Sequence, residues 1–360
     1  MLRPRETNPM SLAFLYRKEL ELCKVRPDET IVVISNLATP DEYVEAAFAA
    51  AAEIGCGIYE MKLNAAFSTT HIGGEHVWHT KGAIEAIEAA DMVIAHHITL
   101  GTEWMARGRA AGTRFLMILD HPDVLARMQS PPGLKEASTY AREKVARAKE
   151  LRVLSRAGTD FRCGLGELRT VTQWGYADEP GHVDQWGVGH VSTWPNIGSA
   201  EGTVVLQPGD AWILPYVRYV EDFVHLDIEK GVIVNVEGKT DAKLIRDFCE
   251  AHRKRAEDDN PWHVSHLGWG IHPNAVLDQI AVHGPDISKL VCTGRAWPGS
   301  FLFSTGPNAQ AGGTNDTAAH IDLPMFGTTV LLDNEVVIEE GRIVDPGMIV
   351  EPIYPLNVAS

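Results

Sequence analysis

Two observations predict that the chain folds as an α/β domain followed by an α+β domain. Up to about residue 150, apolar runs alternate with segments of helical periodicity, the pattern of a parallel sheet covered by helices. Beyond that point, short strand-like runs bounded by Gly, Pro and Asp dominate. The chain has 360 residues, more than one hydrophobic core usually fills. We therefore expect an α/β domain with a parallel sheet at residues 1–152 and an α+β domain at residues 153–360.

The expected N-terminal domain contains apolar runs of strand length and alanine-rich or amphipathic runs of helix length. Its strands are predicted at residues 30–35, 91–95 and 115–119. Its helices are predicted at residues 41–54, 82–90 and 134–151. The first of these helices follows Thr39-Pro40, a sequence that is typical of a helix start.

The expected C-terminal domain is rich in short strands. Residues 202–206 and 211–214 are apolar runs between turn-forming residues. Residues 224–234 alternate between apolar and polar positions and contain Lys230-Gly231, which predicts a β-hairpin with its turn at this dipeptide. One helix is expected at residues 241–255.

Charge and cysteine usage exclude several classes of partner and compartment. Lysine and arginine total 32 against 48 aspartate and glutamate residues, a formal net charge of -16, so neither nucleic acid nor a membrane surface is an expected partner. No apolar run approaches the roughly 18 residues of a spanning helix. The charged N-terminus lacks the apolar stretch of a signal peptide, and the five cysteines are far apart. We therefore expect reduced thiols and a cytoplasmic protein.

Several common catalytic motifs are absent from the sequence. It contains no GxSxG nucleophile elbow, no phosphate-binding GxxxxGK motif, no GxGxxG between a strand and a helix, and no HExxH. Histidine, in contrast, occurs 15 times. Because histidine is the commonest metal ligand and the usual acid or base near neutral pH, this enrichment directs attention to a metal centre.

The strongest metal-binding pattern is His320-Ile321-Asp322. On an extended segment, side chains two positions apart point to the same face, so both can reach one ion. His263 and His266 lie beside glycines, and either could complete a set of two histidines and one carboxylate. That set suits Fe(II) and leaves positions open for substrate and oxygen. The alternative is that His263 or His266 is a hydrogen-bonded core residue next to Trp269.

Other polar residues are weaker candidates. His96 and His97 follow a predicted strand, at the edge where α/β sheets bind ligands, so either is a candidate acid or base. Arg295 could contact an anionic oxygen, or it could be solvated. The remaining cluster is interpreted as a surface loop and consists of His71, His76 and His79.

The second half of the chain resembles the 2,5-dihydroxypyridine 5,6-dioxygenases of bacterial nicotinate catabolism. The motifs that carry this resemblance occur in order over nearly the whole second domain. They are SRAGTDF at 155–161, GYADEPG at 175–181, TWPN at 193–196, SAEGT at 199–203, SHLGWG at 265–270, FLFSTGPN at 301–308 and HID at 320–322.

The resemblance implies a mononuclear Fe(II) dioxygenase whose C-terminal domain is a metal-binding domain similar to that of thermophilic metalloaminopeptidases. It implies His266, His320 and Asp322 as iron ligands. Glu201 matches the position of a second metal ligand in the aminopeptidases, and here it would contact substrate or remain near the iron. The other residues that match the substrate pocket of the family are Glu179, His190, Arg295 and Ser304.

One position departs from the family pattern. The histidine that serves as general base in the family aligns with Gly101, whereas His96 and His97 lie a few residues earlier. Either one of these histidines takes over proton transfer or the substrate differs from 2,5-dihydroxypyridine. His190 is a further candidate for a catalytic role. The resemblance also implies a homo-oligomer.

Three functions are consistent with these residues. The preferred hypothesis is extradiol-type cleavage of a hydroxylated pyridine by O2, with N-formylmaleamate as the product that the resemblance implies for the parent substrate. The second is a metal-dependent aminopeptidase or amidohydrolase with two metals about 3.5–4 Å apart, one of them near Glu201. The third is a binding protein that retains the pocket without catalysis.

Overall fold

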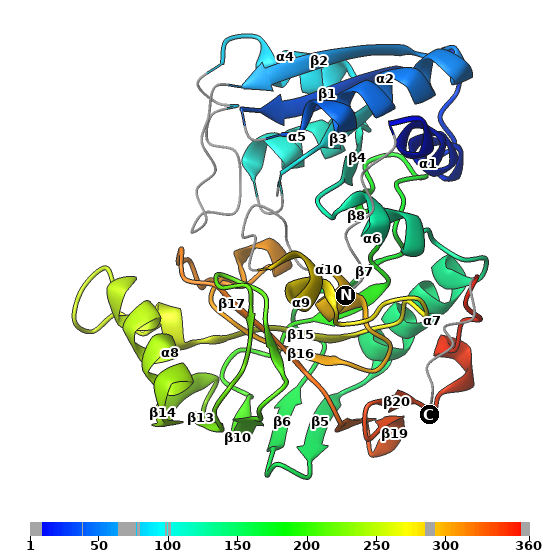
Figure 1. Cartoon of the computed structure of the whole chain (residues 1–360). Coiled ribbons are helices and arrows are strands. Elements are labelled where there is room, and N and C mark those ends of the chain that lie inside the picture. Colours follow the sequence, from blue (N-terminus) through cyan, green and yellow to red (C-terminus); the bar gives the residue numbers. More distant parts are fainter. Residues whose placement is uncertain are drawn as a thin grey trace. The chain divides into compact units, whose positions relative to one another are not determined.

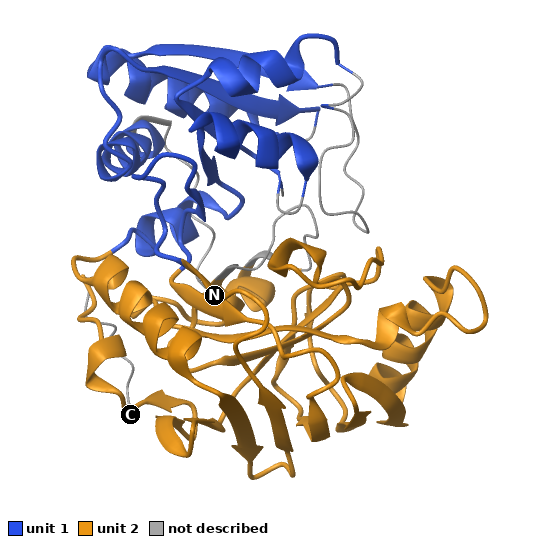
Figure 2. Ribbon diagram, turned by 180° about the vertical axis from the view of Figure 1, so that it is seen from behind, with its two compact units in different colours: residues 1–130, 173–188 blue, residues 131–172, 189–360 orange. Residues whose placement is uncertain are grey.

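The computed structural model describes residues 9–37, 39–63, 77, 80–97, 99, 102–284 and 292–353. The chain forms two compact units (Figure 2). Unit 1 comprises residues 1–130 and 173–188, and unit 2 comprises residues 131–172 and 189–360. Each unit has its own sheets and its own hydrophobic core.

Unit 1 is built on a five-stranded sheet in the order β2-β1-β3-β4-β8, and every neighbouring pair in it is parallel (Figure 1). Its strands are β1 (Thr30–Asn36), β2 (Gly57–Leu63), β3 (Met92–Ala95), β4 (Arg114–Met117) and β8 (Val183–Gln185). Its helices are α1 (Pro9–Leu22), α2 (Asp41–Ile54), α4 (Ala83–Ala89), α5 (Glu103–Ala111) and α6 (Pro122–Arg127).

The central strands of unit 1 are apolar because they are covered on both faces. Ile31 to Ile34 of β1 are completely buried, and so are Met92 to Ile94 of β3. Continuous apolar runs of this kind are typical of parallel strands between helices. The parallel sheet predicted from the sequence is confirmed, and the predicted helix at residues 41–54 is α2 with the same bounds.

Unit 2 contains an eight-stranded sheet in the order β14-β13-β10-β6-β5-β18-β19-β20 and a five-stranded sheet in the order β17-β16-β15-β9-β7. The strands of the larger sheet are β5 (Glu150–Ser155), β6 (Asp160–Gly164), β10 (Glu201–Leu206), β13 (Val224–Glu229), β14 (Val232–Gly238), β18 (Thr328–Leu332), β19 (Glu335–Glu339) and β20 (Arg342–Ile343). The strands of the smaller sheet are β7 (Val171–Gln173), β9 (His190–Thr193), β15 (Val264–Gly270), β16 (Phe301–Thr305) and β17 (Ile321–Met325).

A separate two-stranded ribbon and several helices complete unit 2. The ribbon pairs β11 (Ala211–Trp212) with β12 (Arg218–Tyr219). The α-helices are α7 (Leu134–Arg147), α8 (Thr240–Ala251), α9 (Gln279–His283) and α10 (Cys292–Ala296). The 3-10 turns are η1 (Asn260–Trp262), η2 (Ala309–Ala311) and η3 (Pro346–Met348). The predicted hairpin is present as β13 and β14, and its turn residues Lys230 and Gly231 have positive φ.

The core of unit 2 lies between its two large sheets. Phe161 of β6 meets Phe303 of β16 edge to face, with 5.9 Å between the ring centroids, and both side chains are completely buried. An aromatic pair in this geometry adds stabilisation beyond the area that it buries. The smaller sheet therefore packs against the larger one. The smaller sheet also carries His266 and Asp322.

The division into units lies elsewhere than the boundary expected between residues 152 and 153. Helix α7 ends at Arg147, four residues before the predicted end at residue 151, because β5 begins at Glu150 and pairs with β6 and β18. Helix α7 packs against β9 and so belongs to unit 2. The chain then returns to unit 1 over residues 173–188, where β8 extends the parallel sheet beside β4.

A search of the described residues for membrane-spanning helices finds none of sufficient length and apolar character.

Candidate metal centre

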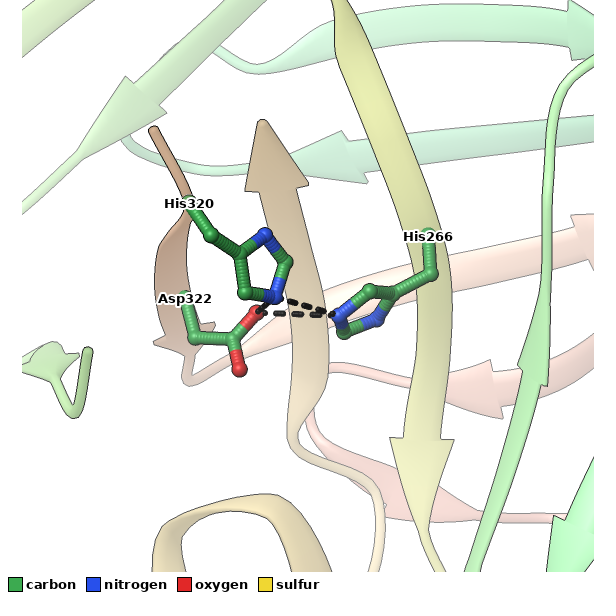
Figure 3. A group of neighbouring side chains, drawn as sticks. All are labelled: His266, His320 and Asp322. Carbon is green, nitrogen blue, oxygen red and sulfur yellow. Dashed lines mark hydrogen bonds and ion pairs between the residues drawn. The ribbon is translucent and has the colours of Figure 1, made fainter. Parts of the chain in front are cut away.

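Three neighbouring strands of the smaller sheet of unit 2 bring His266, His320 and Asp322 together (Figure 3). His266 lies on β15, Asp322 lies on β17, and His320 immediately precedes β17. Between them runs β16, which pairs with both strands. The residues are brought together from positions more than fifty apart in the sequence because the three strands are adjacent in the sheet.

The three donor atoms form a compact triangle. His266 Nε2 lies 3.2 Å from His320 Nε2 and 3.1 Å from Asp322 Oδ1, and His320 Nε2 lies 3.4 Å from the same oxygen. Ligands bound at about 2.1 Å to one ion, at right angles or tetrahedral angles, lie roughly 3.0–3.4 Å apart. The triangle therefore fits a single metal ion. It is the only group of three or more such donors found among the described residues.

Hydrogen bonds behind the triangle orient its members. His320 Nδ1 lies 2.6 Å from the carbonyl oxygen of Thr305, which accepts the Nδ1 proton and leaves Nε2 with its lone pair. The hydroxyl of Ser304 donates to the carbonyl of His266 at 2.6 Å. Both Ser304 and Thr305 belong to β16, so the middle strand holds the ligand-bearing residues on either side of it.

Burial and charge keep the group in its metal-binding form. His266, His320 and Asp322 are 9%, 8% and 3% exposed. Burial alone would raise the pKa of the Asp322 carboxyl, but the nearby His320, His266 and Arg295 outweigh it and hold that pKa below its usual range. Burial lowers the pKa of His320. An ionised carboxylate beside a neutral imidazole is the protonation state that binds a metal ion.

His190 and Arg295 are close enough to act electrostatically on this group. His190, on β9, is completely enclosed, and burial followed by the positive charge of Arg295 holds its pKa well below the usual range. The pKa of His190 also responds to His266 and Asp322, and that of Asp322 responds to Arg295. His190 and Arg295 are two of the four residues that the resemblance assigns to the substrate pocket, and they are 2% and 7% exposed.

Two other candidate residues of unit 2, Glu201 and His263, are not among the three donors of the triangle. Glu201, at the start of β10, belongs to the larger sheet, and its half-exposed carboxylate lies 4.0 Å from Arg162. It is not part of the donor group. His263 lies 3.3 Å from Asp259 and is also outside the group, so His266 is the histidine that joins His320.

Three predicted residues belong to unit 1. Glu179 is exposed on the segment between β7 and β8. His96 and His97 follow β3 and are 6% and 7% exposed. His96 packs edge to face on Tyr43, with ring centroids 5.5 Å apart, and burial lowers its pKa to about 4. The remaining histidines of interest, His71, His76 and His79, lie outside the described residues, as does Gly101.

A model of the NicX family, described as 2,5-dihydroxypyridine 5,6-dioxygenase, matches residues 11–345 of the chain. The chain belongs to this family. A 2,5-dihydroxypyridine 5,6-dioxygenase from Pseudomonas putida KT2440 is 35% identical over 344 residues, which cover 93% of this chain and 96% of the relative. The solved structure of a 2,5-dihydroxypyridine dioxygenase from the same strain matches with a TM-score of 0.88 at 32% identity, covering 95% of this chain and 99% of that one.

A more distant solved structure shares the fold of this NicX-family chain. The aminopeptidase AmpT from Thermus thermophilus matches with a TM-score of 0.61 at 14% identity, covering 93% of this chain and 99% of that chain. The resemblance to metalloaminopeptidases expected from the sequence is thus confirmed at the level of fold.

Two further residues of the segment that starts at His190 contact His190 or the ligand His266. Ser192 Oγ lies 3.0 Å from His190 Nδ1, and Trp194 meets the His266 ring edge to face with centroids 5.7 Å apart. A signal for them was present, because residues 190, 192 and 194 alternate along one extended segment and so point to the same side. The same rule identified the pair at 320 and 322.

Proposed function

We propose that this NicX-family protein is a non-haem Fe(II)-dependent dioxygenase that cleaves the ring of 2,5-dihydroxypyridine or a close analogue with O2. The single observation that carries the proposal is the triangle of His266, His320 and Asp322, placed on a chain 35% identical to a 2,5-dihydroxypyridine 5,6-dioxygenase over nearly its whole length. Two imidazoles and one carboxylate on one side of an ion are typical of oxygen-activating iron sites.

The residues around the metal group suit this chemistry. Bound Fe(II) would supply open positions for the substrate and O2 and a route for electrons between them. Arg295 is buried beside the group and carries the positive charge that would bind an ionised ring oxygen. His190 is neutral and would exchange a proton with the ring hydroxyl. Ser304 holds the backbone of the ligand His266.

We propose no metal-binding role for Glu201, because its carboxylate is half exposed beside Arg162. The residues of unit 1, Glu179, His96 and His97, remain proposed contributors to substrate binding or proton transfer on the strength of the resemblance. A homo-oligomeric assembly is likewise proposed from that resemblance alone.

The test is oxygen consumption by protein that has been loaded with Fe(II) under anaerobic conditions and then mixed with 2,5-dihydroxypyridine and air-saturated buffer. We expect one O2 consumed per ring cleaved, and loss of the substrate absorbance. The variant Asp322→Ala is expected to lose both metal and activity, whereas Glu201→Gln is the matched carboxylate change that keeps the metal. No oxygen uptake with any hydroxypyridine would overturn the proposal.

Metal counting separates this function from a two-metal hydrolase. The donor triangle predicts one ion per chain, because the described residues offer a single group. Two zinc or cobalt ions per chain, together with hydrolysis of an amide substrate, would favour the aminopeptidase alternative instead.

A further inference from the structure

The face of the smaller sheet beside the metal group is formed by two paired strands, β9 and β15. Their register places His190 opposite Gly270 and Ser192 opposite Gly268. His190 and Ser192 are two residues apart, so their side chains emerge on the same side of β9. Bulky or polar side chains on β9 therefore lie beside positions on β15 that have none.

One ring nitrogen of His190 has a partner and the other does not. Ser192 Oγ lies 3.0 Å from His190 Nδ1. His190 Nε2 is buried and has no hydrogen-bond partner among the described residues. A buried polar atom of this kind is normally completed by a ligand or an ordered water. The unpartnered nitrogen is therefore the one available to a bound molecule.

The imidazole ring of His190 occupies space that is open because residue 268 of β15 is a glycine. A Cβ atom at Gly268 would lie 3.1 Å from His190 Cε1 and 1.9 Å from the carbonyl oxygen of Val191. Cε1 lies between the two ring nitrogens, so the imidazole leans over Gly268. In this orientation the ring lies over Gly268 with Nδ1 toward Ser192.

The partners of the two ring nitrogens bear on which of them carries the single proton of a neutral imidazole. Arg295 is a buried cation close enough to His190 to affect its ionisation. A proton on Nδ1 has an acceptor in Ser192 Oγ, whereas a proton on Nε2 would have no acceptor among the described residues. The favoured tautomer has its proton on Nδ1, donated to Ser192 Oγ.

We propose that Ser192 is a positioning residue that holds His190 in the Nδ1-protonated tautomer, with the Nε2 lone pair available to the substrate. This inference rests on the proposed function. In that reaction the O–H bond of the ring hydroxyl breaks and an N–H bond forms at Nε2, which leaves an anionic ring oxygen and an imidazolium whose Nδ1–H still donates its hydrogen bond to Ser192 Oγ. Ser192 touches neither substrate nor metal and acts through His190.

The experiment uses the full chain and three variants. Ser192→Ala removes the hydroxyl, and Ser192→Thr restores one on the same strand position. Ser155→Ala is the matched control, because Ser155 is also a partly buried strand serine of unit 2, and its hydroxyl accepts from Thr159 N in the larger sheet. The ring nitrogens of His190 are observed by 15N NMR in metal-free protein and assigned by their loss in His190→Asn.

In the wild type we expect His190 to show a protonated Nδ1 and an unprotonated Nε2. In Ser192→Ala we expect the His190 signals to shift toward those of the opposite tautomer. In Fe(II)-loaded protein, kcat of Ser192→Ala should fall roughly tenfold, as for other residues that orient a functional histidine, while KM and iron content change less than about twofold. Ser192→Thr should recover kcat, and Ser155→Ala should match the wild type.

Unchanged His190 nitrogen shifts and unchanged kcat in Ser192→Ala would overturn the inference. An equal loss in Ser192→Ala and Ser155→Ala would also overturn it, because that result would indicate only a general loss of stability. If the wild type itself consumes no oxygen with hydroxypyridines, the proposed function fails, but the nitrogen shifts of the metal-free protein still decide the role of Ser192.

Discussion

Ser304 connects the middle strand of the metal-bearing sheet to a ligand residue. Its side chain is completely buried, and its hydroxyl donates to the carbonyl of His266 at 2.6 Å. Replacement by alanine leaves that carbonyl unsatisfied and frees the backbone of β15 beside the ligand. We predict that Ser304→Ala lowers the metal affinity roughly tenfold and the free energy of unfolding by about 1–3 kcal/mol. Titration of the metal-free protein with Co(II) measures the affinity.

The control for this prediction is Thr159→Val, which removes another buried hydroxyl of unit 2. Thr159 Oγ1 donates to the carbonyl of Val205 in the larger sheet, so the variant should lose a similar amount of stability while keeping its metal affinity. A Ser304→Ala protein with wild-type metal affinity and a raised KM would instead show that Ser304 acts mainly on the substrate, as the family resemblance implies.

At the scale of residues, the sequence allowed the donor group to be predicted because the rule behind it is local. His320 and Asp322 are two positions apart on an extended segment, and their shared face follows from strand geometry. The choice between His263 and His266 could not be made from spacing, because it depends on where β15 begins: His266 lies on this strand, and His263 precedes it. The exposed position of Glu201 also depended on sheet membership, which no local pattern encodes.

Among the elements, α7 is fixed to the C-terminal part of unit 2 by one lysine. Lys144 Nζ lies 2.6 Å from Asp345, whose side chain is 2% exposed, and 2.6 Å from Glu335, which is 66% exposed. We predict that Lys144→Met lowers the free energy of unfolding by about 2 kcal/mol or more, because it leaves a buried carboxylate without its cation. Glu335→Gln, which breaks only the exposed pair, should change it by less than about 0.5 kcal/mol. Urea unfolding measures both.

The difference in the free energy of unfolding between the wild type and Lys144→Met should depend on pH, because it depends on the charge of Asp345. Burial alone would raise the pKa of its carboxyl, but the hydrogen bonds from Lys144, Gly347 N and Tyr140, together with the charge of Lys144, outweigh this and lower the pKa below the usual value. The stabilisation is therefore complete above the pKa of an unfolded aspartate and is lost as the pH falls through the folded value. The difference in the free energy of unfolding between the wild type and Lys144→Met should become smaller in acid. A difference that does not change with pH would contradict the role given to Asp345.

Elements with a local signal were predicted well, and those that depend on distant partners were not. The helix α2 and the hairpin of β13 and β14 have the predicted bounds or turn, because capping, periodicity and turn residues lie within each segment. The predicted helix at residues 134–151 overran into β5, whose pairing with β18 involves residues about 180 positions later. The three-residue strand β8 has no periodic signal of its own and is specified by its pairing with β4.

For the whole molecule, the important feature is that the metal group belongs entirely to one unit. His266, His320 and Asp322 all lie in unit 2, joined across β15 and β17, whereas unit 1 has a separate core around its parallel sheet. An ion that binds only the folded form stabilises it by about 2.7 kcal/mol at a concentration of 100 times Kd. This stabilisation should act on unit 2, which holds all three ligands.

We therefore predict that metal protects unit 2 from hydrogen exchange and leaves unit 1 unchanged. At 100 times Kd of Zn(II), amides of β15 and β17 that exchange through unfolding of their unit should exchange about 100-fold more slowly. Amides of β1 and β3, in the core of unit 1, should keep their metal-free rates. Asp322→Asn is the control and should show no response to the metal in either unit. Equal protection of both units by Zn(II) would mean that they unfold as one, with the metal stabilising the entire chain.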